Sequence, residues 1–300
     1  MAERFLPKNK VAAVILVAAA IYLAMVLWFP ILQAFAWSFT DKFMFKMSWV
    51  GLANYHKMFT DDPMFIKAVQ VTLSYMLMVL PTAAVLGLIL AMFVNAVKNV
   101  TVRGFLTASY FLAYVVPLVA VAVVWRYMFE PSRIGLFNSI LDKFGLGTVR
   151  WLMDTQTALP SLAIVGTWHF TGYVLIIYLA GLQTIPDVFY EAAQIDGANR
   201  WNVFRHITLP LLTPTILFVI VIGTLHTMMM FTETYVMTSQ MGMLPGGPLG
   251  STTSMVLYIW ENAFAYQKEG YACAISVILF ILINIITIFQ FRLIRARVEY

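Results

Sequence analysis

The chain has 300 residues, of which 61% are hydrophobic and only 11% are charged, and its mean hydropathy is +0.83. Soluble domains are about half apolar and about a quarter charged, so this composition excludes a soluble globular protein and indicates an integral membrane protein. The net charge of +5 does not indicate nucleic-acid binding, because the basic residues flank apolar runs instead of forming one stripe.

Motifs for catalysis are missing from the sequence. The single cysteine, Cys273, lies in an apolar run and allows neither an internal disulfide nor a cysteine metal cluster. The four histidines lack HExxH-type spacing, and no Gly-x-x-x-x-Gly-Lys-Ser/Thr loop occurs. We therefore expect no enzyme active site, no metal and no bound cofactor, and any ATP and Mg²⁺ that drive the protein would bind to another subunit.

Apolar runs predict an all-α membrane protein with six transmembrane helices in one domain, residues 11–300, after a polar start at residues 1–10. The expected spans are 11–36, 69–93, 104–129, 161–183, 211–237 and 271–291. A cleaved signal peptide is an alternative for the first span, but its apolar stretch continues well past Ala18-Ala19-Ala20.

Two of the expected spans carry a proline in their middle, Pro81 in the second and Pro117 in the third. A proline frees a backbone carbonyl, which lipid cannot satisfy, so we expect both helices to be bent and packed against protein. The polar segment 130–160 has no run long enough to cross a membrane and is expected outside the cell.

Charge distribution predicts cytoplasmic N- and C-termini. With that orientation, ten of the nineteen lysines and arginines fall in the short inner segments, including Lys98, Arg103 and Arg292. The inner side of a membrane protein is the side enriched in Lys and Arg.

The polar segment 184–210 between the fourth and fifth spans is expected to contain a short amphipathic helix, a sharp turn and a second short helix. Thr184 is predicted to cap the first helix, with Pro186 in its first turn. Gly197 suits a helix end that needs positive φ, and Asn199 suits the cap of the second helix. From the pattern alone, a hairpin resting in the lipid headgroups is an equally good interpretation.

This segment resembles the EAA motif of permease subunits of binding-protein-dependent ABC importers. The matching residues are Glu191-Ala192-Ala193, Asp196-Gly197-Ala198, Phe204, Ile207, Leu209 and Pro210. The resemblance implies a coupling helix that docks on a separate ATPase subunit through Glu191, Ala192, Ala193, Asp196, Gly197 and Ala198. It also implies a second homologous permease, two ATPase subunits, an extracytoplasmic solute-binding protein and a place in the inner (cytoplasmic) membrane.

Other segments resemble the sugar and glycerol-phosphate branch of the same family. They are Gly51-Leu-Ala-Asn54-Tyr55, Phe231-Thr-Glu233-Thr-Tyr235 and Tyr258-Ile-Trp260. The chain departs from the family where extra residues precede Gly246-Gly247-Pro248, which leaves the shape of the outer loop 239–250 open.

A polar solute needs hydrogen-bonding side chains and aromatic faces along its path, because sugars present both hydroxyls and apolar C–H faces. The candidates are His169, Phe170, Tyr173, Thr227, Met230 and Glu233, with Asn284 on the sixth span. Each has an ordinary alternative, since a lone His or Thr in a membrane helix often bonds a neighbouring helix or its own backbone. Glu233 is expected at the outer interface or beside a cation.

Two other functions compete with the importer. A proton-coupled secondary transporter would use Glu233 as its proton site. A membrane scaffold or receptor would need no ATPase partner. Neither explains the EAA-like residues.

Overall fold

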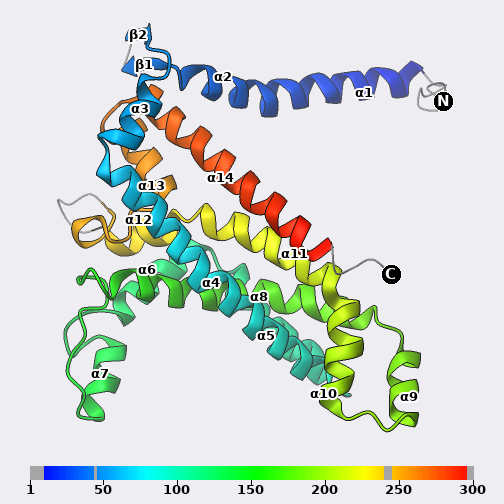
Figure 1. Ribbon diagram of the computed structural model, residues 1–300. Helices are drawn as coiled ribbons and strands as arrows, with labels where there is room; N and C mark the ends of the chain where they lie inside the picture. Colours follow the sequence, from blue (N-terminus) through cyan, green and yellow to red (C-terminus); the bar gives the residue numbers. More distant parts are fainter. Residues whose placement is uncertain (1–9, 44–45, 240–244, 296–300) are drawn as a thin grey trace. The chain divides into compact units, whose positions relative to one another are not determined.

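The computed structural model describes residues 10–43, 46–239 and 245–295, and the chain divides into two compact units (Figure 1). One unit comprises Met1–Asp62 and Ile259–Leu279, and the other Pro63–Tyr258 and Phe280–Tyr300. Residues 1–9 of the predicted N-terminal segment and most of the extra outer-loop residues lie outside the described residues.

The smaller unit holds the first apolar helix, a hairpin and the start of the last helix. Its helices and strands are α1 (Lys10–Leu23), η2 (Ala24–Trp28), α2 (Phe29–Trp37), β1 (Thr40–Phe43), β2 (Lys46–Trp49), α3 (Ala53–Thr60), η5 (Glu261–Ala265) and the first part of α14 (Glu269–Arg295). The segment Ala12–Trp37 is long and apolar enough to cross a membrane, and none of its most apolar window is buried within the chain.

The β1–β2 hairpin was not predicted from the sequence. Thr40 pairs with Trp49 and Phe43 with Lys46 in an antiparallel ladder. Asn54, in the family-like sequence Gly51 to Tyr55, has a structural role after the hairpin. Its side chain donates to the carbonyls of Ser38 and Thr40, both at 2.9 Å. These two bonds hold α3 against the hairpin.

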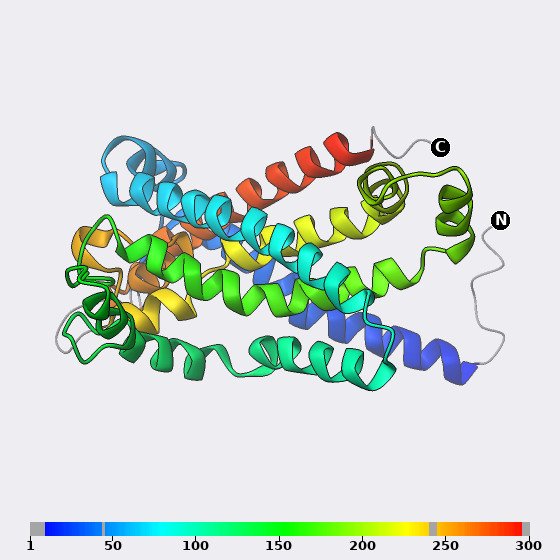
Figure 2. The same ribbon diagram turned by 90° about the horizontal axis from the view of Figure 1, so that it is seen from below.

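The larger unit contains the remaining helices. They are α4 (Pro63–Asn95), α5 (Val100–Val115), α6 (Leu118–Met128), α7 (Leu136–Lys143), α8 (Ala158–Gln183), α9 (Asp187–Ile195), α10 (Arg200–Val203), η3 (Phe204–Thr208), α11 (Leu209–Met228), α12 (Thr232–Thr238), η4 (Pro248–Gly250), α13 (Met255–Trp260) and the rest of α14. Figures 1 and 2 show α7 beyond one end of α8 and α9 beyond the other. The 130–160 segment and the 184–210 segment therefore lie at opposite ends of this unit.

Apolar helices overlap every range in which a span was expected, which makes this an all-α membrane protein. Five helices are long and apolar enough to cross a membrane, and the bent pair α5–α6 makes a sixth if it counts as one span. The assignment of six crossings stays a prediction.

The two mid-span prolines behave differently. Pro117 follows the end of α5, and α6 leaves at 88° to it, as the bend predicted there requires. At Pro81 the chain does not break, and α4 continues as one helix from Pro63 to Asn95. A proline removes one backbone hydrogen bond, and burial of Val79, Leu80 and Ala83 against protein keeps α4 continuous around that gap.

Glycines let α8 approach its neighbours closely. A Cβ on Gly172 would lie 2.6 Å from the carbonyl oxygen of Tyr110 on α5, and one on Gly181 would lie 2.6 Å from Oγ1 of Thr215 on α11. Small residues at helix contacts are the usual means of close packing in membranes, where lipid offers no hydrophobic driving force. As a result α8 is the most buried of the long helices and packs against α4, α5 and α11.

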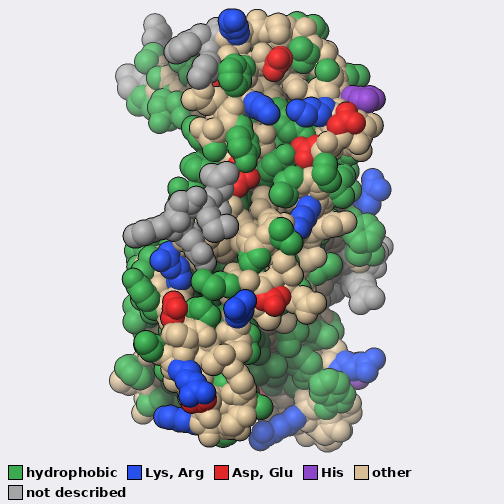
Figure 3. Space-filling model, turned by 90° about the vertical axis from the view of Figure 1, so that its left-hand side faces the viewer, with side chains coloured by type: hydrophobic (Ala, Val, Ile, Leu, Met, Phe, Trp, Pro, Cys, Tyr) green, Lys and Arg blue, Asp and Glu red, His purple; other side chains and the backbone are tan. Residues whose placement is uncertain are grey.

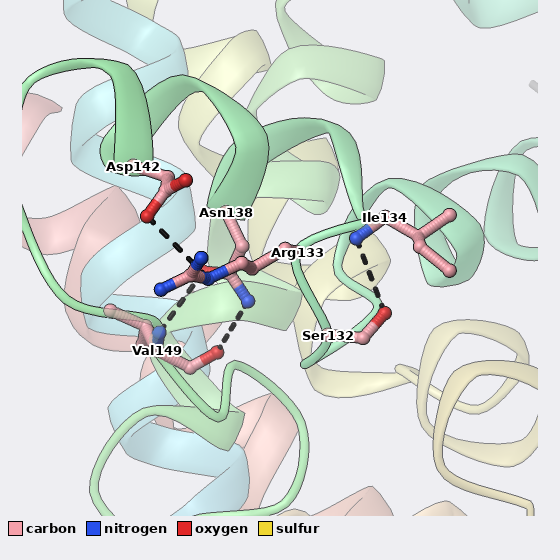
Figure 4. Close-up of polar contacts among 6 residues, drawn as sticks. All are labelled: Ser132, Arg133, Ile134, Asn138, Asp142 and Val149. Carbon is pink, nitrogen blue, oxygen red and sulfur yellow. Dashed lines mark hydrogen bonds and ion pairs between the residues drawn. The ribbon is translucent and has the colours of Figure 1, made fainter.

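The 130–157 loop is organised by one buried amide (Figure 4). The Nδ2 of Asn138 donates to the carbonyls of Glu130 (3.2 Å) and Val149 (3.0 Å), and its Oδ1 accepts from Val149 N and Trp151 Nε1, both at 3.0 Å. Around it, Arg133 Nε lies 3.6 Å from Asp142 Oδ1, an exposed pair that contributes little. Asn138 thus joins α7 to residues 149–151 of the loop before α8.

We predict that Asn138→Ala destabilises the purified protein by roughly 2–4 kcal/mol, because buried donors on Val149 and Trp151 lose their acceptor. Thermal unfolding in detergent measures this effect. The matched control is Ser132→Ala, which removes one exposed hydroxyl bond to Ile134 in the same loop and should change stability by less than about 0.5 kcal/mol. Equal effects of the two substitutions would contradict the role given to Asn138.

Candidate functional site: the coupling segment and an aromatic cluster

The segment 184–210 folds as two short helices around a tight turn, as predicted. α9 ends in a Schellman motif, in which the amide of Ala198 donates to Ala193 O (2.9 Å) and that of Gly197 to Gln194 O (3.1 Å). Gly197 has φ +72°, a conformation that residues with a Cβ rarely adopt. Asn199 then caps α10, its side chain accepting from the amide of Asn202 at 2.8 Å.

The predicted cap at Thr184 is wrong. The Thr184 hydroxyl donates to Gly181 O at 2.7 Å and so completes the end of α8 instead. α9 begins at Asp187 after Pro186, which makes no side-chain cap. Thr184 still has helical backbone angles, and the chain becomes extended only at Pro186, so its side chain cannot reach the amides of α9.

A groove of about 550 Å³ lies between α9 and the α10–η3 turn. It is lined by Phe189, Ala192, Ala193, Asp196, Ala198, Asn202, Val203, His206 and Ile207. Four of the six predicted coupling residues line it; Gly197 forms the turn beside it, and Glu191 is exposed on α9 outside it. The hydroxyls of Tyr190 and Thr208, 3.3 Å apart, connect the two sides of the segment.

The outer surface of this segment is apolar and exposed. Val188 and Phe189 on α9 and Trp201 on α10 are exposed, and Ile195 has 86% of its surface accessible. An amphipathic helix normally buries such a face. The segment therefore presents apolar side chains and a groove with small residues at the end of the unit opposite α7 (Figure 1).

Aromatic rings from three helices meet in the middle of the larger unit. On α8, His169 lies 5.2 Å from Tyr114 of α5, and Phe170 stacks at 4.6 Å and 11° on His226 of α11. Tyr173 adds a contact of 5.0 Å to Tyr114. We call these five residues the aromatic cluster. Sequence analysis identified His169, Phe170 and Tyr173 but missed Tyr114 and His226.

His169 is the most unusual member of the cluster. It is 5% exposed, and neither ring nitrogen makes a hydrogen bond of good geometry within the described chain. The backbone of Val116, where α5 breaks from α6, lies beside it. Buried polar groups are nearly always paired, so an unpaired imidazole next to a helix break is a group available to a ligand or water.

A second cavity of about 370 Å³ begins beside the cluster on α11 and is lined by His226, Met230 and Glu233, among others. Two of the predicted path residues therefore share a cavity. Thr227 does not line it, because its hydroxyl is fully buried and donates to Gly223 O at 2.7 Å within its own helix. The Asn284 side chain likewise donates to Phe280 O at 2.8 Å on its own helix.

Glu233 was expected at the outer interface or beside a cation, and within the described chain its side-chain partner is a tyrosine and not a cation. It is 3% exposed, and its Oε1 accepts from the hydroxyl of Tyr75 at 3.2 Å. The nearby cation Arg126 instead donates to the carbonyls of Val236 (3.4 Å) and Ser239 (3.2 Å). The break between α11 and α12 turns Glu233 inward toward α4, which the linear order of the sequence does not reveal.

One face of the molecule carries charged side chains of both signs (Figure 3). On the face drawn in Figure 3, acidic and basic side chains of the described residues alternate with hydrophobic and uncharged ones. The two features that bear on the predicted function are the exposed segment at one end of α8 and the aromatic cluster in its middle.

Comparison with known proteins places this arrangement in a family. Residues 83–300 match the family of binding-protein-dependent transport system inner membrane components, and the chain belongs to that family. It is 36% identical over 262 residues to a probable ABC transporter permease protein, YesP, of Bacillus subtilis, covering 85% of this chain and 81% of that protein. It is a multi-pass permease of the ABC importer class, and a proton-coupled transporter is not favoured.

A second relative is the arabinooligosaccharides transport system permease protein AraP of Bacillus subtilis, 32% identical over 287 residues, or 95% of this chain and 89% of that one. Among solved structures, a chain of a bacterial ABC transporter involved in the import of the acidic polysaccharide alginate superposes with a TM-score of 0.83. It covers 96% of each chain at 24% identity, a likeness of fold.

We predict that Glu233→Gln preserves uptake to within about twofold, because a glutamine oxygen can still accept the hydrogen bond from Tyr75. Uptake in vesicles energised with ATP and with the proton gradient collapsed measures this. Loss of uptake in Glu233→Gln, with normal membrane insertion, would show that the carboxylate itself is needed and would revive the proton-coupled mechanism.

Proposed function

We propose that this permease forms part of the path for a sugar or a related polyol or glycerol-phosphate-type solute and is driven by separate ATPase subunits that bind the segment 184–210. The observation that carries the proposal is the exposed groove between α9 and α10, bounded by small residues and tied directly to α8 and α11. A second homologous permease, two ATPase subunits with ATP and Mg²⁺, and an extracytoplasmic solute-binding protein complete the transporter.

The orientation follows from the same segment. We place it, with both chain termini, on the cytoplasmic side of the cell membrane, and the 130–160 loop on the outer side. The bias of basic residues toward the inner segments supports this. So does the position of α9 and α7 at opposite ends of the larger unit (Figure 2).

Coupling depends on a small contact. Ala192, Ala193 and Ala198 leave room for a partner side chain to enter the groove, while Asp196 at its edge and exposed Glu191 beside it offer carboxylates to a basic partner. When ATP closes the ATPase dimer, the segment moves with it. Because the segment joins α8 to α11, its movement shifts the two helices that carry most of the aromatic cluster, and the cavity changes its opening.

Selectivity for a sugar fits the chemistry of the cluster. Aromatic faces pack against the C–H faces of a sugar ring, and the imidazoles and phenol can bond its hydroxyls. The relative AraP is named for arabinooligosaccharides, which agrees with this class of solute. The solute is identified by an ATPase assay on the reconstituted complex. The binding protein is loaded in turn with neutral di- and oligosaccharides, and the saccharide that stimulates ATP hydrolysis is the solute.

Coupling is tested by Gly197→Asp. The positive φ at position 197 strains any residue with a side chain, and the new charge lies at the edge of the groove. Because the strain displaces the contact with the ATPase subunit, ATP-driven uptake should fall to background, below about 5% of the wild-type rate. The matched control is Gly145→Asp, which has φ +71° and open space around it but lies in the 130–160 loop. Uptake should persist in the control. Normal uptake in Gly197→Asp would contradict the proposal.

The solute path is tested by Tyr173→Leu, which removes an aromatic face and hydroxyl from the cluster. We expect the KM for uptake to rise about fivefold with little change in maximal rate, since one stacking contact contributes about 1 kcal/mol. Tyr110→Leu is the control, one turn before Tyr114 on α5 but lining a separate apolar groove. An unchanged KM in Tyr173→Leu, or the same rise in Tyr110→Leu, would remove the cluster from the path.

A further inference from the structure

A further cavity, of about 450 Å³, lies within the smaller unit beside the β1–β2 hairpin. The residues that matter for its chemistry are Asp41, Lys46, Ser48, Lys57, Lys268 and Tyr271. Its volume is in the usual range for a small-ligand site. It is formed by the hairpin, α3, Lys268 and the first turn of α14, and it has no part in the coupling segment or the aromatic cluster.

The cavity has an excess of positive charge. Three ammonium groups and one carboxylate, Asp41, line it, and none of the three lysines is in an ion pair with a described residue. The acidic groups nearby are already engaged. Glu269 pairs with Lys42 at 2.5 Å, and Asp62 accepts from the Tyr271 hydroxyl at 2.5 Å.

The backbone that carries two of the lysines is anchored, and all three lysines are exposed to a ligand. Lys268 forms a β-bridge with Phe43 of the hairpin, and the Lys57 ammonium lies 5.2 Å from the centre of the Tyr271 ring. The two hydrogen bonds from Asn54 fasten α3, which carries Lys57, to the start of β1. An anchored backbone lowers the entropy lost when these lysines gather around an anion.

The position of the cavity along the chain points to the lipid headgroups. β1 begins three residues after Trp37, the end of one apolar span, and Lys268 directly precedes Glu269, the start of another. Phe43 and Met47 on the hairpin are exposed, and so is Trp49, with 72% of its surface accessible. Exposed aromatic side chains next to span ends are typical of the membrane–water interface, where lipid phosphates also lie.

We propose that this cavity binds the phosphodiester of an anionic lipid headgroup. The lysines would donate to the phosphate oxygens, with the Ser48 hydroxyl as a further donor, and the exposed apolar side chains of the hairpin would lie against the lipid chains. The same cationic chemistry could hold free phosphate, but the exposed apolar hairpin and the adjoining span ends favour a lipid.

The experiment compares two short-chain lipids on the intact chain purified in an uncharged detergent. Dihexanoyl-phosphatidylglycerol should raise the unfolding temperature at much lower concentration than dihexanoyl-phosphatidylcholine. In Lys57→Gln/Lys268→Gln the half-maximal concentration of phosphatidylglycerol should rise about 25-fold. This figure assumes that the loss of each lysine weakens the affinity for the lipid about fivefold. Lys57→Arg/Lys268→Arg keeps both charges and should behave like the wild type.

Lys98→Gln/Lys143→Gln is the matched control, since it removes two exposed lysines outside the cavity and should leave the response unchanged. The proposal is overturned if the cavity variant responds as the wild type does. It is also overturned if inorganic phosphate stabilises the wild type as well as phosphatidylglycerol does, which would make the occupant a free anion. Loss of stimulation by the solute-binding protein, with the lipid response intact, would assign the lysines to a protein contact instead.

Discussion

Close packing of α8 against α4, α5 and α11 is the interaction on which the rest of this permease depends. Glycines at 172 and 181 bring backbones and hydroxyls of neighbouring helices to within van der Waals contact of α8. In a bilayer no hydrophobic force drives helices together, so this packing has to come from shape. A bulkier residue at either position would push α8 away from its neighbouring helices. That movement would displace both the aromatic cluster and the 184–210 segment, which α8 carries.

That packing makes α8 a rigid connection between two sites. Its middle carries His169, Phe170 and Tyr173, and its end joins the 184–210 segment through Thr184. α11, which brings His226 to the cluster, leaves the same segment at its other end. A displacement imposed on the segment therefore reaches the aromatic cluster through two helices at once, without any chemistry in the chain itself. The helix breaks at Val116 and Met229 border the cluster and its cavity, and they are the places where helical geometry can change at least cost.

The local features of the coupling segment could be predicted from the sequence, and the contacts between helices could not. Gly197 and Asn199 form the turn and cap that their residue types favour, because both depend on neighbouring backbone. Tyr114 and His226 were missed because they join the cluster across three helices whose rotation no periodicity defines. The inward turn of Glu233 and the unbroken helix at Pro81 have the same origin, since tertiary packing decides both. The roles in solute binding and coupling remain predictions.

The central claim is that the 184–210 segment is the contact with a nucleotide-hydrolysing subunit. The most direct measurement places a photoreactive benzoylphenylalanine at Ile195, which is 86% exposed on α9, and at Ile134, which is 91% exposed at the opposite end of the unit. In membranes that contain the assembled transporter, illumination should join position 195, and not position 134, to a protein that binds ATP. An adduct of position 195 with lipid alone, or equal adducts with the ATP-binding protein from both positions, would contradict the account.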